Sequence, residues 1–162
     1  MASAVFEAVD GDDRYADVPI HVVPGVSAAQ AAAALAGAPL GADFAIMSLS
    51  DRLKPWSVVA TRLRAAAEAD LVIALYNPRS RSRPDQLFEA REVLLEVKDA
   101  ATVVVVARDV GRPGESLTVT TLGELDPGQV DMSCLVVIGA SSTRVTAAGR
   151  VWTPRYVPAQ AD

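Results

Sequence analysis

The sequence predicts an α/β domain whose mixed, mostly parallel sheet of about five or slightly more strands is flanked by helices. Short apolar runs alternate with segments whose apolar residues recur at helical spacing, as in chains that build parallel sheets. Residues typical of turns, mainly glycine, proline and serine, follow most of the apolar runs. With 162 residues, of which 51% are hydrophobic, the chain can bury one substantial core.

The first clear unit is the apolar run 20–23, which ends at Pro24 and Gly25 and is followed by an alanine-rich segment. Proline cannot donate to a strand ladder and Ser27 is a favoured N-cap, so a strand, a tight turn and a helix to about residue 35 are predicted. Ligands of α/β proteins bind where such helix N-termini meet the carboxyl ends of strands. A purely structural turn is the alternative.

The rest of the chain alternates between predicted strands and helices. The strands cover residues 44–49, 71–75, 102–107, 115–121 and 134–138, and the helices cover 55–68 and 85–98, after a short helical segment at 2–9. The strand at 71–75 is apolar throughout, which is typical of a central strand covered on both faces. The strand at 115–121 alternates in polarity after a tight turn, so it should pair antiparallel with its predecessor. Val151 and Trp152 are predicted to add an edge strand.

Four loops of small and polar residues are predicted to gather at the carboxyl ends of the strands. They cover residues 24–27, 76–83, 108–114 and 139–143. Loops at this end of a sheet carry function in such folds. None of the four contains a complete nucleotide-binding or catalytic-serine motif.

Composition excludes several classes of function. The net charge of −5 and the pI of about 4.9 provide no overall basic field, so neither nucleic acid nor a membrane is an expected partner. One histidine, His21, and one cysteine, Cys134, leave no usual zinc-ligand set, so no metal is expected. Without a signal-peptide pattern or a spanning apolar run, a cytoplasmic protein is predicted. His21 is expected to be a packed or edge residue, and Cys134 a small buried hydrophobe.

Five motifs, in register, closely resemble those of the tetrapyrrole methylase family. They are VPGVSAAQAAA at 23–33, GAPLG at 37–41, SLSD at 48–51, ALYNPRS at 74–80 and ARDVGR at 107–112. The resemblance covers about residues 1–157 and is strongest to members that methylate ring carbon 17 of precorrin-3B in cobalamin synthesis. It implies an S-adenosylmethionine-dependent methyltransferase, usually a homodimer, with the methyl donor bound between two α/β domains. It also implies ring contraction accompanying the methylation.

The sequence departs from the family in one large respect. Members begin with a domain that carries a G-x-G-P-G-D loop and a G-D-P loop at the donor site, and neither is present. The resemblance therefore implies a remnant of a first-domain helix and linker at 1–18, the carboxy-terminal α/β domain at 19–157 and a frayed tail at 158–162. Another chain would supply the missing half of the donor site. A non-catalytic dimerisation or partner-binding domain is the alternative, and an unrelated α/β domain that binds a small ligand is a third.

Eight residues are expected, by resemblance, to contact the donor. Ser27 and Ala28 would meet its methionine or ribose portion, Asn77 next to Tyr76 its adenosine, and Asp109 and Val110 its adenine, with Ala140 and Ser141 close by. Three of them have a structural alternative: Ser27 as an N-cap, Tyr76 as a packed ring with a bonded hydroxyl, and Asp109 as a turn former.

Three arginines of the loop at 76–83, namely Arg79, Arg81 and Arg83, are expected to bind carboxylates of a precorrin-type substrate, because guanidinium pairs with carboxylate in a bidentate fork. A solvated basic loop is the alternative. Methyl transfer from a sulfonium needs alignment more than a strong base. The acid–base residue for ring contraction is unassigned, with Asp109 and Glu115 as candidates.

Overall fold

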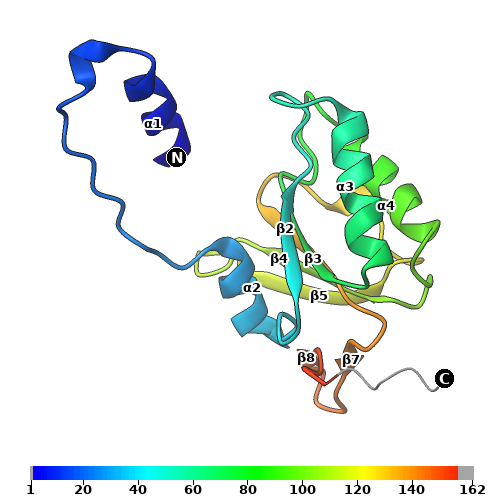
Figure 1. The fold of residues 1–162 in the computed structure, drawn as a ribbon. Coiled ribbons are helices and arrows are strands. Elements are labelled where there is room, and N and C mark those ends of the chain that lie inside the picture. Colours follow the sequence, from blue (N-terminus) through cyan, green and yellow to red (C-terminus); the bar gives the residue numbers. More distant parts are fainter. Residues whose placement is uncertain (1, 157–162) are drawn as a thin grey trace.

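The computed structural model describes residues 2–156 and shows a mixed sheet with helices on both faces (Figure 1). The helices are α1 (Ala2–Asp10), α2 (Ala28–Ala36), α3 (Trp56–Glu68) and α4 (Gln86–Leu95), with 3-10 turns η1 (Asp13–Tyr15) and η2 (Pro127–Gln129). The main strands are β2 (Phe44–Ser48), β3 (Val72–Tyr76), β4 (Val103–Arg108), β5 (Ser116–Thr121) and β6 (Cys134–Ile138). The predicted helices and these five predicted strands are confirmed, with small differences at their ends. The tail predicted to fray, 158–162, lies outside the described residues.

The prediction of a mostly parallel sheet is wrong. The strand order is β2-β3-β6-β4-β5, and only β2 and β3 pair in parallel. β6 pairs antiparallel with both β3 and β4, and β5 pairs antiparallel with β4, as the sequence predicts for that hairpin. The five-stranded sheet is therefore mixed, with mainly antiparallel pairs.

The position of β6 is the physical reason for this error. β2, β3 and β4 do run in the same direction, because a helix joins each to the next and returns the chain to its starting end. β3 and β4 are nevertheless not neighbours, because β6 inserts between them in the opposite direction. The carboxyl end of β6 thus lies at the other end of the sheet from those of β3 and β4.

Two helical layers cover the sheet (Figure 1). α3 and α4 pack on one face against Ile73, Leu75, Val104, Val136 and Ile138. α2 packs on the other face through Ala29, Ala32 and Ala36, which are fully buried against alternate residues of the same strands. Alanine side chains let the α2 backbone lie close to the sheet, so the N-terminus of this helix reaches the ends of β3 and β4.

The predicted edge strand at Val151 and Trp152 is part of a second, small sheet. Its order is β1 (Gly37–Ala38), β8 (Val151–Trp152) and β7 (Arg144–Val145). Gly37 has φ +138°, and a Cβ at this position would lie 2.5 Å from the carbonyl oxygen of Val151. Glycine is therefore needed where β1 meets β8.

The predicted strand at 20–23 is wrong, because residues 18–27 form neither helix nor strand. Val22 and Val23 are 61% and 84% exposed, and His21 is exposed too, so it is neither a packed nor an edge residue. β-branched residues favour a strand only where a neighbouring strand is available. The segment instead joins α2 to α1, which stands apart from the sheet and buries no residue (Figure 1). No helix within residues 2–156 is long and apolar enough to cross a membrane.

Candidate functional site

A cavity of about 320 Å³ lies where β3 and β4 end and α2 begins. We call this end of the sheet the cavity end. Five of the eight predicted donor residues line the cavity: Ala28, Tyr76, Asn77, Asp109 and Val110. The other lining residues are Ala31, Ala107, Arg112, Met132, Ser133, Cys134 and Leu135. Three segments that are far apart in the sequence thus meet as that prediction requires.

Two residues with left-handed backbone follow the strands directly. Asn77 has φ +51° and Asp109 has φ +47°, a region that Asn and Asp adopt more readily than other non-glycine residues. The side chain of Asn77 donates to Ser48 Oγ at 2.9 Å, and the amide of Asp109 donates to the carbonyl of Ser133 at 3.1 Å. Both residues turn the chain sharply at the rim of the cavity, and sparsely populated conformations of this kind concentrate at functional sites.

The first amide groups of α2 point toward the cavity end. Ser27 caps the helix in a capping box, accepting from Gln30 N and donating its own amide to Gln30 Oε1. The hydroxyl of Tyr76 accepts from Ala29 N at 2.9 Å. Ser27 is therefore an N-cap, and the hydroxyl of Tyr76 is hydrogen-bonded, as the structural alternatives for these two residues predict. Of the first three helix amides, only that of Ala28 has no acceptor within residues 2–156.

The three arginines of the loop after β3 differ in their contacts and in their exposure to solvent. Arg79 donates to the carbonyl oxygens of Pro84 and Gly128, at 3.0 and 3.3 Å. Arg83 is only 9% exposed and does not line the cavity, whereas Arg81 is exposed. Arg79 and Arg81 line a second cavity of about 480 Å³ with Asp131 and Ser133. The expectation of three arginines directed at a substrate therefore does not hold for Arg83.

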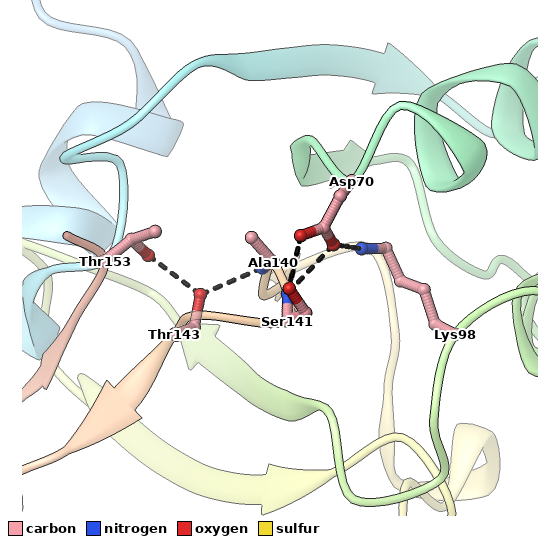
Figure 2. Close-up of polar contacts among 6 residues, drawn as sticks. All are labelled: Asp70, Lys98, Ala140, Ser141, Thr143 and Thr153. Carbon is pink, nitrogen blue, oxygen red and sulfur yellow. Dashed lines mark hydrogen bonds and ion pairs between the residues drawn. The ribbon is translucent and has the colours of Figure 1, made fainter. Parts of the chain in front are cut away.

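Ala140 and Ser141 lie at the opposite end of the sheet, so the prediction that they lie near Asp109 is wrong. Because β6 runs antiparallel, its register pairs Cys134 with Arg108 and Ile138 with Val104. The amide and hydroxyl of Ser141 donate to Asp70, and Lys98 Nζ donates to the same carboxylate at 2.9 Å (Figure 2). We call this the Asp70 end.

Burial and hydrogen bonding act in opposite directions on Asp70. Desolvation raises its pKa, but the hydrogen bonds from Ser141 and Lys98 outweigh it, so the pKa of Asp70 lies below its ordinary value. A cavity of about 580 Å³ also lies at this end. The polar groups that Figure 2 draws there bond to one another rather than remaining open to a ligand.

The amino end of β6 supplies a wall that the sequence did not predict. Arg108 donates to Asp131 at 2.8 Å, and this contact lowers the pKa of Asp131 and raises that of Arg108. Cys134 is buried as predicted, and desolvation raises the pKa of its thiol, so it is not a thiolate nucleophile at neutral pH. Only the direction of β6 could have identified Met132, Ser133 and Leu135, because their residue types carry no signal of a site.

The cavity end combines a small apolar lining with a few polar groups. Ala28, Ala31 and Ala107 leave room for a flat ring, and the carboxylate of Asp109 accepts no hydrogen bond from the described residues. Glu115, the other acid–base candidate, accepts from the amide of Gly111 at 2.6 Å and does not line the cavity. Within residues 2–156, no group of three or more His, Cys, Asp or Glu could hold a metal ion. The geometry suits a planar ligand that carries hydrogen-bonding groups.

Comparison with known proteins agrees with the family resemblance. The family model of the tetrapyrrole (corrin/porphyrin) methylases matches residues 2–126. A precorrin-3B C(17)-methyltransferase of Sinorhizobium sp is 49% identical over 161 residues, which cover 96% of this chain and 63% of the relative. The crystal structure of the methyltransferase CobJ matches with a TM-score of 0.92 and 42% identity, over 95% of this chain and 64% of that one.

A more distant likeness shows the fold alone. The uroporphyrin-III C-methyltransferase of Thermus thermophilus, solved in complex with S-adenosylhomocysteine, matches with a TM-score of 0.59 and 21% identity, over 84% of this chain and 57% of that one. The chain spans less than two thirds of each of these proteins. The family model covers most of the chain, and close sequence and structural relatives cover nearly all of it, so the chain belongs to the tetrapyrrole (corrin/porphyrin) methylases.

Proposed function

We propose that this chain forms one wall of an S-adenosylmethionine site and takes part in methyl transfer to ring carbon 17 of precorrin-3B in cobalamin biosynthesis. The name and 49% identity of the Sinorhizobium relative support the substrate, and the donor analogue in the Thermus thermophilus structure supports the cofactor. The single observation that carries the proposal is the cavity end. There, residues from the starts of α2 and of the loops after β3 and β4 line one cavity.

The residues present fit this donor. The free amide of Ala28 and the carboxylate of Asp109 offer a hydrogen-bond donor and an acceptor at the rim. The side chains of Ala31, Ala107 and Leu135 give the cavity an apolar lining that suits an adenine ring. Bound S-adenosylmethionine supplies an activated sulfonium methyl, so the task of these residues is to orient the donor and to exclude water.

Of the two candidates for acid–base assistance to ring contraction, Asp109 is the stronger. Among the described lining residues of the cavity, Asp109 alone carries a carboxylate. Glu115 is engaged by the turn at Gly111, so it is the weaker candidate. We therefore propose Asp109 for any proton transfer that this chain contributes.

A second candidate function is a partner-binding half that binds no donor alone. Exposed Val22, Val23 and Val26, the last 81% exposed, precede the N-cap of α2 beside the cavity end. Exposed apolar residues in such a run are typical of a surface that a partner covers. The partner would be a second copy or a chain that carries the opposing wall. Light scattering that shows a monomer at high concentration would count against a homodimer.

Calorimetric titration of the chain with S-adenosylhomocysteine separates the two candidates. We expect binding in the micromolar range, and a loss of about 100-fold or more when Ala28→Trp fills the cavity. Ala34→Trp is the matched control, because Ala34 is an exposed alanine of the same helix outside the cavity. Absence of heat with the unmodified chain would contradict donor binding by this chain alone and favour the second candidate.

A further inference from the structure

We propose that Arg83 is a positioning residue that holds two parts of the cavity wall, Asn77 and Met132, in place. The inference rests on the proposed donor site, because Asn77 and Met132 both line that cavity. They belong to different segments, the loop after β3 and the segment before β6. Arg83 contacts both and is not itself a lining residue.

The contacts of Arg83 are unusual for a buried cation. Its side chain reaches Asn77 O through Nη1 at 3.4 Å and Met132 Sδ through Nη2 at 3.6 Å. Its Nε is buried with no partner, and within residues 2–156 it forms no ion pair. Buried charges are normally paired with an opposite charge. A charge that gains so little from its neighbours is a poor stabiliser, so a role in stability alone does not account for it.

The loop folds back on itself, so that the side chain of Arg83 reaches the carbonyl of Asn77. Ser80 and Arg83 form a two-way backbone bridge, with N–O distances of 3.0 and 3.1 Å. On the outer side, Arg79 fastens the loop to η2 through the carbonyl of Gly128. Asn77 is therefore held at both ends, by Ser48 at its side chain and by Arg83 at its carbonyl.

The guanidinium group suits this task and an ammonium does not. Its planar fork presents several N–H donors in fixed directions, so one side chain can serve a carbonyl and a thioether on two segments. Lysine would offer a single point charge. Arg83→Lys should therefore keep the charge and lose the bridge, while Arg83→Met removes the charge and keeps most of the packing volume.

A ligand-free measurement tests the bridge directly. With methyl-¹³C methionine in the full chain, the Met132 resonance, assigned with Met132→Leu, should move in both Arg83→Met and Arg83→Lys. The Met47 resonance should not move. Arg81→Met is the matched control, because Arg81 is an exposed arginine of the same loop, and it should leave the Met132 resonance in place. An unmoved Met132 resonance in both Arg83 variants would overturn the proposal.

Binding of S-adenosylhomocysteine tests the consequence for the site. Arg83→Met should weaken binding about tenfold, with the urea midpoint of unfolding unchanged or raised. A lowered midpoint with unchanged affinity would mean a purely structural role and overturn the inference. If the unmodified chain does not bind S-adenosylhomocysteine, the proposed function fails. The Met132 methyl resonance then decides by itself whether Arg83 holds Asn77 and Met132 in place.

Discussion

The two ends of the sheet each carry a cavity and a group of polar residues, but they differ in how those residues are satisfied. At the Asp70 end, Lys98 and Ser141 both donate to the carboxylate of Asp70 (Figure 2). At the cavity end, the amide of Ala28 and the carboxylate of Asp109 have no partner among the described residues. The larger cavity lies at the Asp70 end. The polar groups of the cavity end are therefore open to a ligand, whereas those of the Asp70 end are engaged within the protein.

The comparison predicts that substitutions at the Asp70 end lower stability, whereas those at the cavity end lower ligand affinity. The largest loss of stability is expected for Asp70→Asn. The side chain of Lys98 is only 4% exposed, and Asp70 is its hydrogen-bond partner in the structure. Because Asp70 itself is partly exposed, we expect a loss of roughly 2 to 3 kcal/mol at pH 7, below that of a fully buried pair. Urea unfolding measures it, with exposed Asp43→Asn as the control.

The pH dependence of this loss has a definite sign. The pKa of Asp70 is lowered in the folded state, so its contribution is present above the ordinary value of 3.8 and lost as the pH falls through the folded value. The difference between the unmodified chain and Asp70→Asn should therefore be largest near neutral pH and shrink below about pH 3.8. A difference that stays constant down to pH 2 would contradict the ion pair.

A smaller loss of stability is expected for Thr143→Val. Thr153 donates to the carbonyl of Pro39 at 2.6 Å, so the hydroxyl of Thr143 must donate to Thr153 while it accepts from Ala140 N. Valine keeps the shape but leaves that buried amide without an acceptor, at a cost of roughly 1 to 2 kcal/mol.

Urea unfolding also checks this prediction, with Thr120→Val as the control, because Thr120 is a half-exposed residue of β5. Binding of S-adenosylhomocysteine should be the same in both variants. A loss of affinity in Thr143→Val would mean that the two ends of the sheet are coupled.

The smallest effect on stability is expected for Asp109→Gly at the cavity end. Glycine adopts a φ of +47° without strain, so stability should change by less than about 0.5 kcal/mol. The affinity for S-adenosylhomocysteine should nevertheless fall about tenfold, because the free carboxylate is lost. Asp109→Asn removes the charge but keeps a hydrogen-bond acceptor, so it separates these two contributions. An affinity for S-adenosylhomocysteine that is unchanged in both variants would show that Asp109 is not part of the site.

Local patterns in the sequence predicted much of the fold and of the cavity end. The N-cap at Ser27 and the turns after β3 and β4 follow from residue types that favour those conformations, and in the structure Ala28, Asn77 and Asp109 line one cavity. The family motifs added the chemistry that these positions could perform.

The errors share a physical cause, since they concern neighbours rather than local conformation. An apolar run such as residues 134–138 predicts a buried strand but carries no information on its direction, so Ala140 and Ser141 were assigned to the wrong end. The valines of residues 20–23 favour a strand only beside another strand. Arginine is mostly exposed in proteins, so composition could not identify Arg83 as buried.

The insertion of β6 also dictates the order in which the chain can fold during synthesis. Ile138 pairs with Ile73 on one side and with Val104 on the other, so β3 and β4 are joined only after the last main strand has left the ribosome. Until then, both strands expose apolar edges that could pair with other chains. The strand that completes the centre of the five-stranded sheet is thus the last of its five strands to be made, and nascent chains that stall before it remain exposed to aggregation.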